Sequence, residues 1–245
     1  MLNLIKINIL KEIWELKNNK GKIFLSLFIN SIVFIYLYRT LMDNSDFLGI
    51  NFQHLFIFYL LFVILISSFS FTSNIVYLEA NNGTINHFLL SHNKLVTFVI
   101  IRSLIHCFKT TATVFIMLVF IVILLKININ LASLIGVTFT GLIGLYGIGI
   151  AFSSLSLVFK DIKAIISLFK VGFIYLLFKQ NENIFIPFSY AKGLIWDIIL
   201  NEYKISDFPI SSLSIVFLNS LVYFIIGLIM FNYFEKIAMK KGIQS

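Results

Sequence analysis

Apolar runs of about twenty residues or more recur along this 245-residue chain, and they constrain its fold more than any other feature. A helix rises about 1.5 Å per residue, so a run of this length crosses the roughly 30 Å of hydrocarbon in a bilayer. Hydrophobic residues make up 59% of the chain and charged residues only 12%, whereas a soluble domain has roughly 25% charged residues. The sequence therefore predicts an all-α integral membrane protein.

Six apolar runs predict six transmembrane helices within one domain, residues 23–245. Pro209 comes just before the last run, where a missing backbone donor does little harm to a helix. The third run carries charges near its start, so we expect only residues 110–125 of it to lie deep in lipid. Residues at about 179–209 separate the last two runs. The predicted spans cover residues 23–42, 52–78, 95–125, 131–159, 164–178 and 210–234.

The first 22 residues are too charged to cross a membrane, but they have helical periodicity. Polar residues fall on one arc of a helix and apolar residues on the opposite arc, the polar arc holding Asn8, Lys11, Glu12, Glu15 and Asn18. This pattern predicts an amphipathic helix on the cytoplasmic membrane surface, with Lys6 and Lys17 extending their charges to its edges. The residues expected to enter the interface include Ile5, Ile9, Ile13 and Trp14.

The distribution of basic residues predicts the orientation. With the N-terminus inside, fourteen of the nineteen lysines and arginines lie in cytoplasmic segments and five lie outside. Positive residues near span ends stay on the cytoplasmic side, so both termini are expected there. The high content of Ile, Asn, Lys and Phe is typical of an AT-rich bacterial genome, which indicates a bacterial cytoplasmic membrane.

The sequence offers little for catalysis. It contains no His-Glu-x-x-His, no Gly-x-Ser-x-Gly and no phosphate-binding Gly-x-x-x-x-Gly-Lys-Ser/Thr loop. Cys107 is the single cysteine, and it is expected to be structural, as is its neighbour His106. Basic residues flank the apolar runs and do not form one basic face, which disfavours nucleic-acid binding. We expect no enzymatic activity, no metal and no cofactor in this chain.

Several residues within the runs have two interpretations. Arg102, Lys109 and Lys170 lie close enough to cytoplasmic ends for their charges to reach the surface, or they form a basic vestibule for an anionic group. The glycines of residues 131–159 indicate close helix packing, with a hinge as the alternative. Aromatic residues of the second run face lipid or a neighbouring helix, or they line a substrate path. The candidates for that path are Phe62, Phe69 and Phe71.

Residues 79–94 read Glu-Ala-Asn-Asn-Gly-Thr-Ile-Asn-His-Phe-Leu-Leu-Ser-His-Asn-Lys and come after the second run on its cytoplasmic side. This segment resembles the coupling loop of type-2 ABC transporter permeases, in which an acidic residue and a Gly-Thr pair precede a short helix. It departs from that family at residues 91–93, where Thr-Pro is common. Physically, Gly83 can end the second span and Thr84 can cap the next helix. The positions that match the family's loop are Glu79, Gly83, Thr84, His87, Leu89 and Leu90.

Two further segments are similar to the same family. Residues 147–163 resemble its fourth span running into a cytoplasmic turn, in which Asp161 matches the acidic position. Residues 186–196 resemble its short external helices, although the Gly- and Pro-containing piece before them is largely missing. This similarity implies that residues at about 179–209 form an external re-entrant region. The resemblance implies a homodimer or a pair with a related permease subunit. It also implies a separate cytoplasmic ATPase subunit that binds ATP and Mg²⁺ and docks on residues 79–94.

The implied function is export of an amphipathic or hydrophobic substrate. The Phe-rich spans and the scarcity of charge within them favour a peptide such as a bacteriocin or cytolytic toxin, followed by a hydrophobic drug and then a lipid-linked polysaccharide. A membrane immunity or scaffold protein that binds a toxic peptide without transporting it is the alternative from another class. An intramembrane enzyme ranks third because no catalytic set is present.

Overall fold

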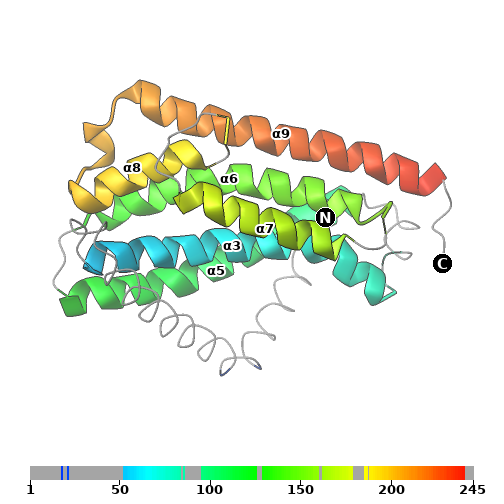
Figure 1. The fold of residues 1–245 in the computed structure, drawn as a ribbon, viewed down its shortest axis with the longest axis horizontal. Helices are drawn as coiled ribbons and strands as arrows, with labels where there is room; N and C mark the ends of the chain where they lie inside the picture. Colours follow the sequence, from blue (N-terminus) through cyan, green and yellow to red (C-terminus); the bar gives the residue numbers. More distant parts are fainter. Residues whose placement is uncertain are drawn as a thin grey trace.

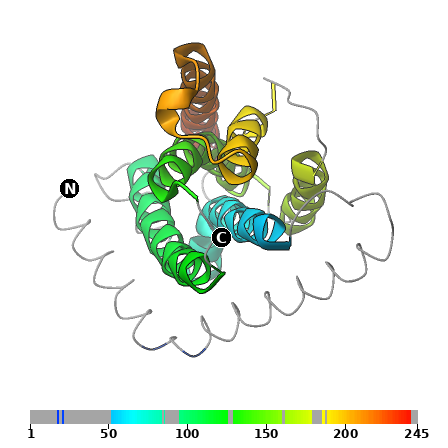
Figure 2. The same cartoon turned by 90° about the vertical axis from the view of Figure 1, so that its left-hand side faces the viewer.

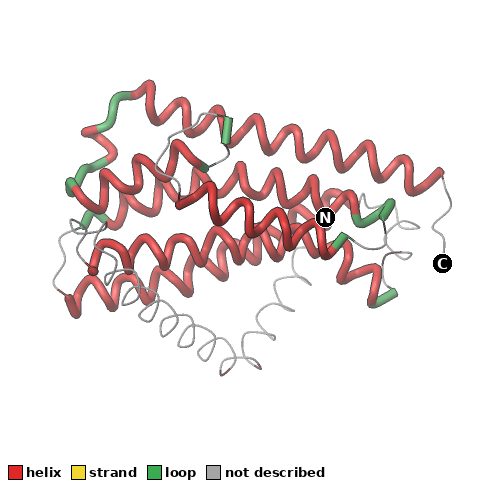
Figure 3. Tube along the Cα trace, viewed as in Figure 1, coloured by secondary structure: helices red, strands yellow, loops and turns green. Residues whose placement is uncertain are grey.

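The computed structural model describes a bundle of α-helices, and the described residues contain no strand (Figures 1 and 3). The described residues are 18, 21, 52–83, 85, 95–125, 129–159, 162–178, 185–186 and 188–240. The predicted surface helix 1–22 and the predicted first span 23–42 therefore fall almost wholly outside them. The helices are α3 (Phe52–Asn81), α5 (Leu95–Leu125), α6 (Leu131–Leu155), α7 (Lys163–Phe178), α8 (Ser189–Leu200), the 3-10 helix η2 (Ile205–Asp207) and α9 (Ile210–Lys240).

Each predicted apolar run within the described residues forms a helix. The start of α9 directly after Pro209 is confirmed, and the Pro209 carbonyl accepts hydrogen bonds from Ser212 N and Leu213 N. The ends differ by a few residues. The helix α6 ends at Leu155, and the next three residues form turns with hydrogen bonds to carbonyls three residues earlier. The helix α9 continues six residues beyond the predicted end at residue 234.

Four helices of the described chain are long and apolar enough to cross a membrane. The segments are Val63–Asn81, Leu95–Ile116, Leu131–Leu155 and Ile210–Lys240. The helix α7 has 16 residues and is about 24 Å long, which is less than the roughly 30 Å of a hydrocarbon core. The described part of the fold is therefore an all-α bundle of the kind found in membrane proteins.

The helix α6 lies at the centre of the bundle, and its glycines allow close packing. It packs on α9, α3 and α8, and the end-on view shows it between α9 and α3 (Figure 2). A Cβ atom on Gly147 would lie 2.5 Å from the backbone nitrogen of Phe224 in α9. A Cβ atom on Gly149 would lie 2.8 Å from Cβ of Thr72 in α3. These contacts support the packing interpretation of the glycines over the hinge.

The antiparallel order of the helices gives the bundle two distinct ends. One end, here called the loop end, carries the last turn of α3, the first turn of α5 and the last turns of α9, at the right of Figure 1. At the opposite end η2 docks on α6, where Ser133 Oγ accepts a hydrogen bond of 3.0 Å from Ile205 N. Asn130 caps α6 there and accepts from Ser133 N at 3.0 Å.

Candidate functional site

A buried ion pair joins α3 to α5 at the loop end. Glu79 lies in the last turn of α3 and is only 5% exposed, and its Oε1 contacts Arg102 Nη1 of α5. The guanidinium carbon of Arg102 lies 5.9 Å from the ring centre of Phe71 and 5.7 Å from that of Phe98. Arginine tolerates such surroundings because its delocalised charge is weakly hydrated and stacks on aromatic faces. The charge of Arg102 is thus compensated within the protein.

His106 continues this interface one helical turn further along α5. Its ring stacks on Phe71 with 3.7 Å between the ring centres and 5° between the planes. Thr110 Oγ1 lies 3.3 Å from His106 Nδ1 and donates to the His106 carbonyl at 2.7 Å. Cys107 is buried, with Sγ 3.8 Å from Thr111 Oγ1. These contacts support the structural interpretation of His106 and Cys107.

A second buried carboxylate reaches the loop end from α9. Glu235 is 7% exposed, and its Oε1 accepts a hydrogen bond of 3.2 Å from the backbone nitrogen of Leu95. Leu95 is the first residue of α5, where backbone N–H groups have no partner within the helix. A carboxylate is favourable there because the helix dipole is positive at its N-terminus. Glu235 therefore joins α9 to the start of α5.

Sequence reasoning did not identify Glu235, although a signal was present. Phe231 and Ala238 are buried on either side of it in α9. Positions 231, 235 and 238 recur on one face of a helix at spacings of four and three. An acidic residue within such an apolar stripe has to pair with a donor inside the protein.

The ion pair and Glu235 flank the connection between α3 and α5. This connection leaves α3 at Gly83, which has a φ of +70° and donates to the Ala80 carbonyl at 3.0 Å. The helix of the second apolar run thus ends at Asn81, before a turn that contains Gly83, and glycine adopts this left-handed conformation without the steric cost of a Cβ atom. The other predicted coupling residues, Thr84, His87, Leu89, Leu90 and Asp161, lie outside the described residues.

The residues predicted to line a substrate path are divided between two sides of α3. Phe69 is buried, with its ring centre 5.9 Å from that of Phe152 in α6 and 6.4 Å from that of Phe169 in α7. Phe71 instead faces α5, as described above. Lys170 is partly buried on α7, and the side chain of Phe62 lies outside the described part of the chain. In the described structure the two aromatic residues stabilise two different helix contacts.

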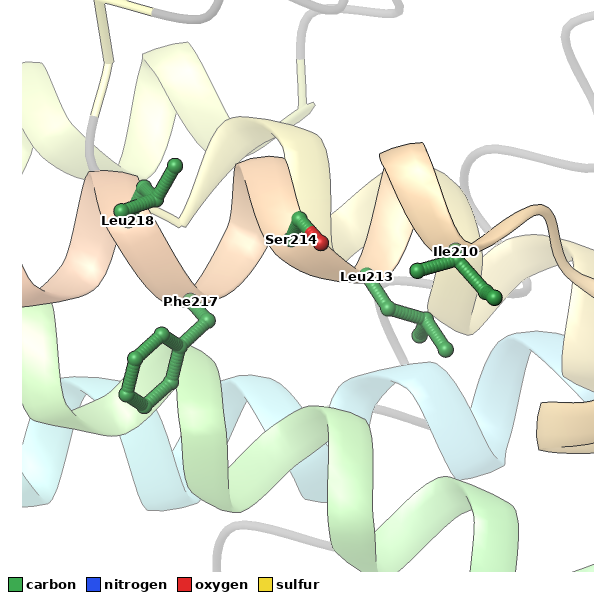
Figure 4. A pocket seen from close by; sticks show the side chains of 5 residues that line it. All are labelled: Ile210, Leu213, Ser214, Phe217 and Leu218. Carbon is green, nitrogen blue, oxygen red and sulfur yellow. The ribbon is translucent and has the colours of Figure 1, made fainter.

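A groove of about 410 Å³ runs along α9 near its start (Figure 4). Its lining residues all belong to α9, and most of them are apolar. Ile210 is 82% exposed, and Phe217 and Leu218 are also exposed. The groove is thus a feature of the outer apolar face of α9, which suits contact with lipid tails. The lining residues are Ile210, Leu213, Ser214, Phe217 and Leu218.

The buried charged side chains of the loop end join helices to one another. Among them, no group of three or more His, Cys, Asp or Glu side chains is placed to hold a metal ion. The fold and the site define a helical-bundle protein with apolar helices of membrane-spanning length and a charged, buried junction at the loop end. No protein-family model, curated protein or solved structure matches the chain.

Proposed function

We propose that the chain is the membrane-spanning permease subunit of an ATP-driven exporter in a bacterial cytoplasmic membrane. The observation that carries the proposal is the connection between α3 and α5. It leaves α3 at Gly83 and is flanked by two buried carboxylates, Glu79 and Glu235, which bind α5. The helix ends on either side of the connection are thus joined to neighbouring helices, so force on the connection can pass to the bundle. The full proposal includes six spans, an interfacial N-terminal helix and two cytoplasmic termini.

The charges of the described residues support this orientation. Lys163, Lys236 and Lys240 are exposed toward the loop end. The opposite end carries Asp197, Glu202 and Asp207, together with Lys192 and Lys204. Positive residues next to membrane helices stay in the cytoplasm, so the loop end is proposed to face inward. The connection would then meet a soluble ATPase.

The proposed mechanism assigns ATP and Mg²⁺ to a separate ATPase subunit. That subunit would contact the connection at Thr84, His87, Leu89 and Leu90, and Asp161 in the next cytoplasmic turn. ATP-driven closure of two such subunits would press on these contacts and on the surface helix, and the spans of a permease dimer would move. ATP and substrate must bind the two access states with unequal affinity, since a ligand with equal affinity for both shifts nothing.

The proposed substrate is amphipathic or hydrophobic, with a peptide such as a bacteriocin or cytolytic toxin ranked first. Sixteen per cent of the residues are aromatic, and the buried charges of the loop end are engaged in protein contacts. Such spans suit an apolar substrate better than a highly charged one. Hydrophobic drugs and lipid-linked polysaccharides are the other substrate classes.

Transport and its dependence on the connection test this proposal together. The protein is purified with any ATPase that accompanies it, reconstituted into proteoliposomes, and assayed for ATP-dependent uptake of each substrate class. Charged substitutions Gly83→Glu and Leu90→Glu should leave ATP hydrolysis in place while uptake is lost. Asn201→Glu adds the same charge at an exposed position of the opposite end and should transport normally.

Unchanged uptake in both connection variants would contradict the proposal. Purification without a stoichiometric ATPase, combined with binding of a toxic peptide, would instead support an immunity or scaffold protein.

A further inference from the structure

The hydrogen bond between Glu235 and Leu95 joins two helices that otherwise make little contact. The helix α9 packs mainly on α6, and α5 packs mainly on α3. The bond spans 140 residues of sequence and lies in the interior of the loop end. Around it, Phe231 of α9 belongs to the same apolar cluster as Leu95, Val96 and Val99 of α5. The acceptor is therefore held in position by packing on both sides.

Breaking this bond costs free energy on both helices, because each loses a hydrogen-bond partner. The Leu95 N–H would lose its acceptor at a helix start, and the Glu235 carboxylate would lose a donor in a buried site. A small displacement of the first turn of α5 is thus opposed unless the last turns of α9 move with it. The bond makes joint movement of the two segments the favourable response.

We infer that Glu235 is a positioning residue that makes the first turn of α5 and the last turns of α9 move together. The role of this coupling rests on the proposed function: it would carry force from the connection after α3 into the C-terminal helix. The ion pair of Glu79 with Arg102 joins α5 to α3 about two turns further along α5. Force on the connection would then reach α3 and α9 through separate buried carboxylates.

Hydrogen–deuterium exchange of the full-length protein in lipid nanodiscs tests the coupling without any ATPase. Glu235→Ala should raise exchange about tenfold or more in residues 95–102, which include Leu95 and the first hydrogen-bonded turn of α5, and also in the last turns of α9, because a bond to a charged acceptor is lost. Glu235→Asp keeps the charge but shortens the side chain by about 1.5 Å, so it should behave like the alanine variant. Glu235→Gln keeps an oxygen acceptor at full reach, so its effect should be the smallest of the three.

Lys236→Ala is the matched control, since Lys236 is the exposed neighbour on the same turn. Exchange in Glu235→Ala and Glu235→Asp equal to that of Lys236→Ala in both segments would overturn the inference. So would an increase confined to only one of the two segments. Glu235→Asp, which keeps the charge and most of the side-chain volume, allows the test even if the alanine variant does not fold.

The transport assay separates this inference from the proposed function. In a coupled exporter, Glu235→Asp should hydrolyse ATP at the normal rate and lose export at least tenfold, whereas Lys236→Ala should export normally. Normal export by Glu235→Asp would overturn the role of the bond in force transfer. Absence of ATP-dependent uptake in the unsubstituted protein would instead refute the proposed function, and the exchange data would still decide whether α5 and α9 are coupled.

Discussion

The close backbone contact between Gly147 and Gly227 predicts that Gly227→Ala destabilises the protein. A Cβ atom on Gly227 would lie 2.7 Å from the carbonyl carbon and 2.9 Å from Cα of Gly147. Ordinary contacts of this kind begin at 3.4 Å, so α6 and α9 would have to separate by about 0.7 Å or more. The obstacle is backbone, which cannot rotate away as a side chain can. Gly227→Ala should therefore weaken the most extensive helix contact of the described bundle.

The expected cost comes from overpacking, which typically destabilises a packed core by about 1–3 kcal/mol. Gly172 in α7 provides the control, because a Cβ atom there would meet nothing within 4 Å. Gly172→Ala should be stabilising by about 0.5–1 kcal/mol, since alanine has the better helix propensity. The unfolding free energies of the two variants should thus differ by about 1.5–4 kcal/mol.

The assay is equilibrium unfolding in mixed micelles, with thermal melting of the detergent-solubilised protein as a second readout. Gly227→Ala should melt earlier than the unsubstituted protein, and Gly172→Ala should not. Equal melting of the two alanine variants would refute the view that the glycines of α6 and α9 are there for close backbone contact.

Three further features of the structure are tested by the same unfolding assay. Replacing Arg102 with Met should cost about 3–5 kcal/mol because Glu79 stays buried without its ion-pair partner, whereas the double change E79M with R102M should recover most of that loss. A double variant as unstable as R102M would contradict the ion pair. Gly83→Ala should cost about 1–2 kcal/mol from its positive φ, and Gly83→Asn less, because asparagine tolerates the left-handed region; equal losses would argue against that conformation. Asn130→Ala should lower the free energy of unfolding by about 1 kcal/mol because it removes the cap of α6. The control is Ala132→Ser at a nearby exposed position, and an Asn130→Ala variant as stable as this control would contradict the cap.

Much of the helical layout could be predicted from the sequence, because the length of an apolar run and the proline or glycine beside it determine a helix locally. Pro209 marked the start of α9, and Gly83 marked the end of α3. The extent of α9 was underestimated because hydropathy falls after residue 234, while the spacing of Phe231, Glu235 and Ala238 continues the buried face.

The candidate site was harder to predict because its contacts are not local. Glu79 was singled out by its resemblance to a coupling loop, but its partner, Arg102, lies on the next helix and was assigned to a different role. Glu235 was missed because its donor is a backbone group 140 residues away. Which faces of two helices meet depends on three-dimensional packing, and a uniformly apolar helix has no polar face to indicate it.

In the proposed exporter the loop end faces the cytoplasm, where an ATPase can reach the connection between α3 and α5. Cysteine labelling in intact cells tests it most directly, in a Cys107→Ser background that removes the single native thiol. Lys236→Cys probes the loop end and Lys204→Cys the opposite end, and both positions are exposed. A membrane-impermeant maleimide should label Lys204→Cys in intact cells and Lys236→Cys only after lysis. Labelling of Lys236→Cys in intact cells, with Lys204→Cys protected, would contradict the account.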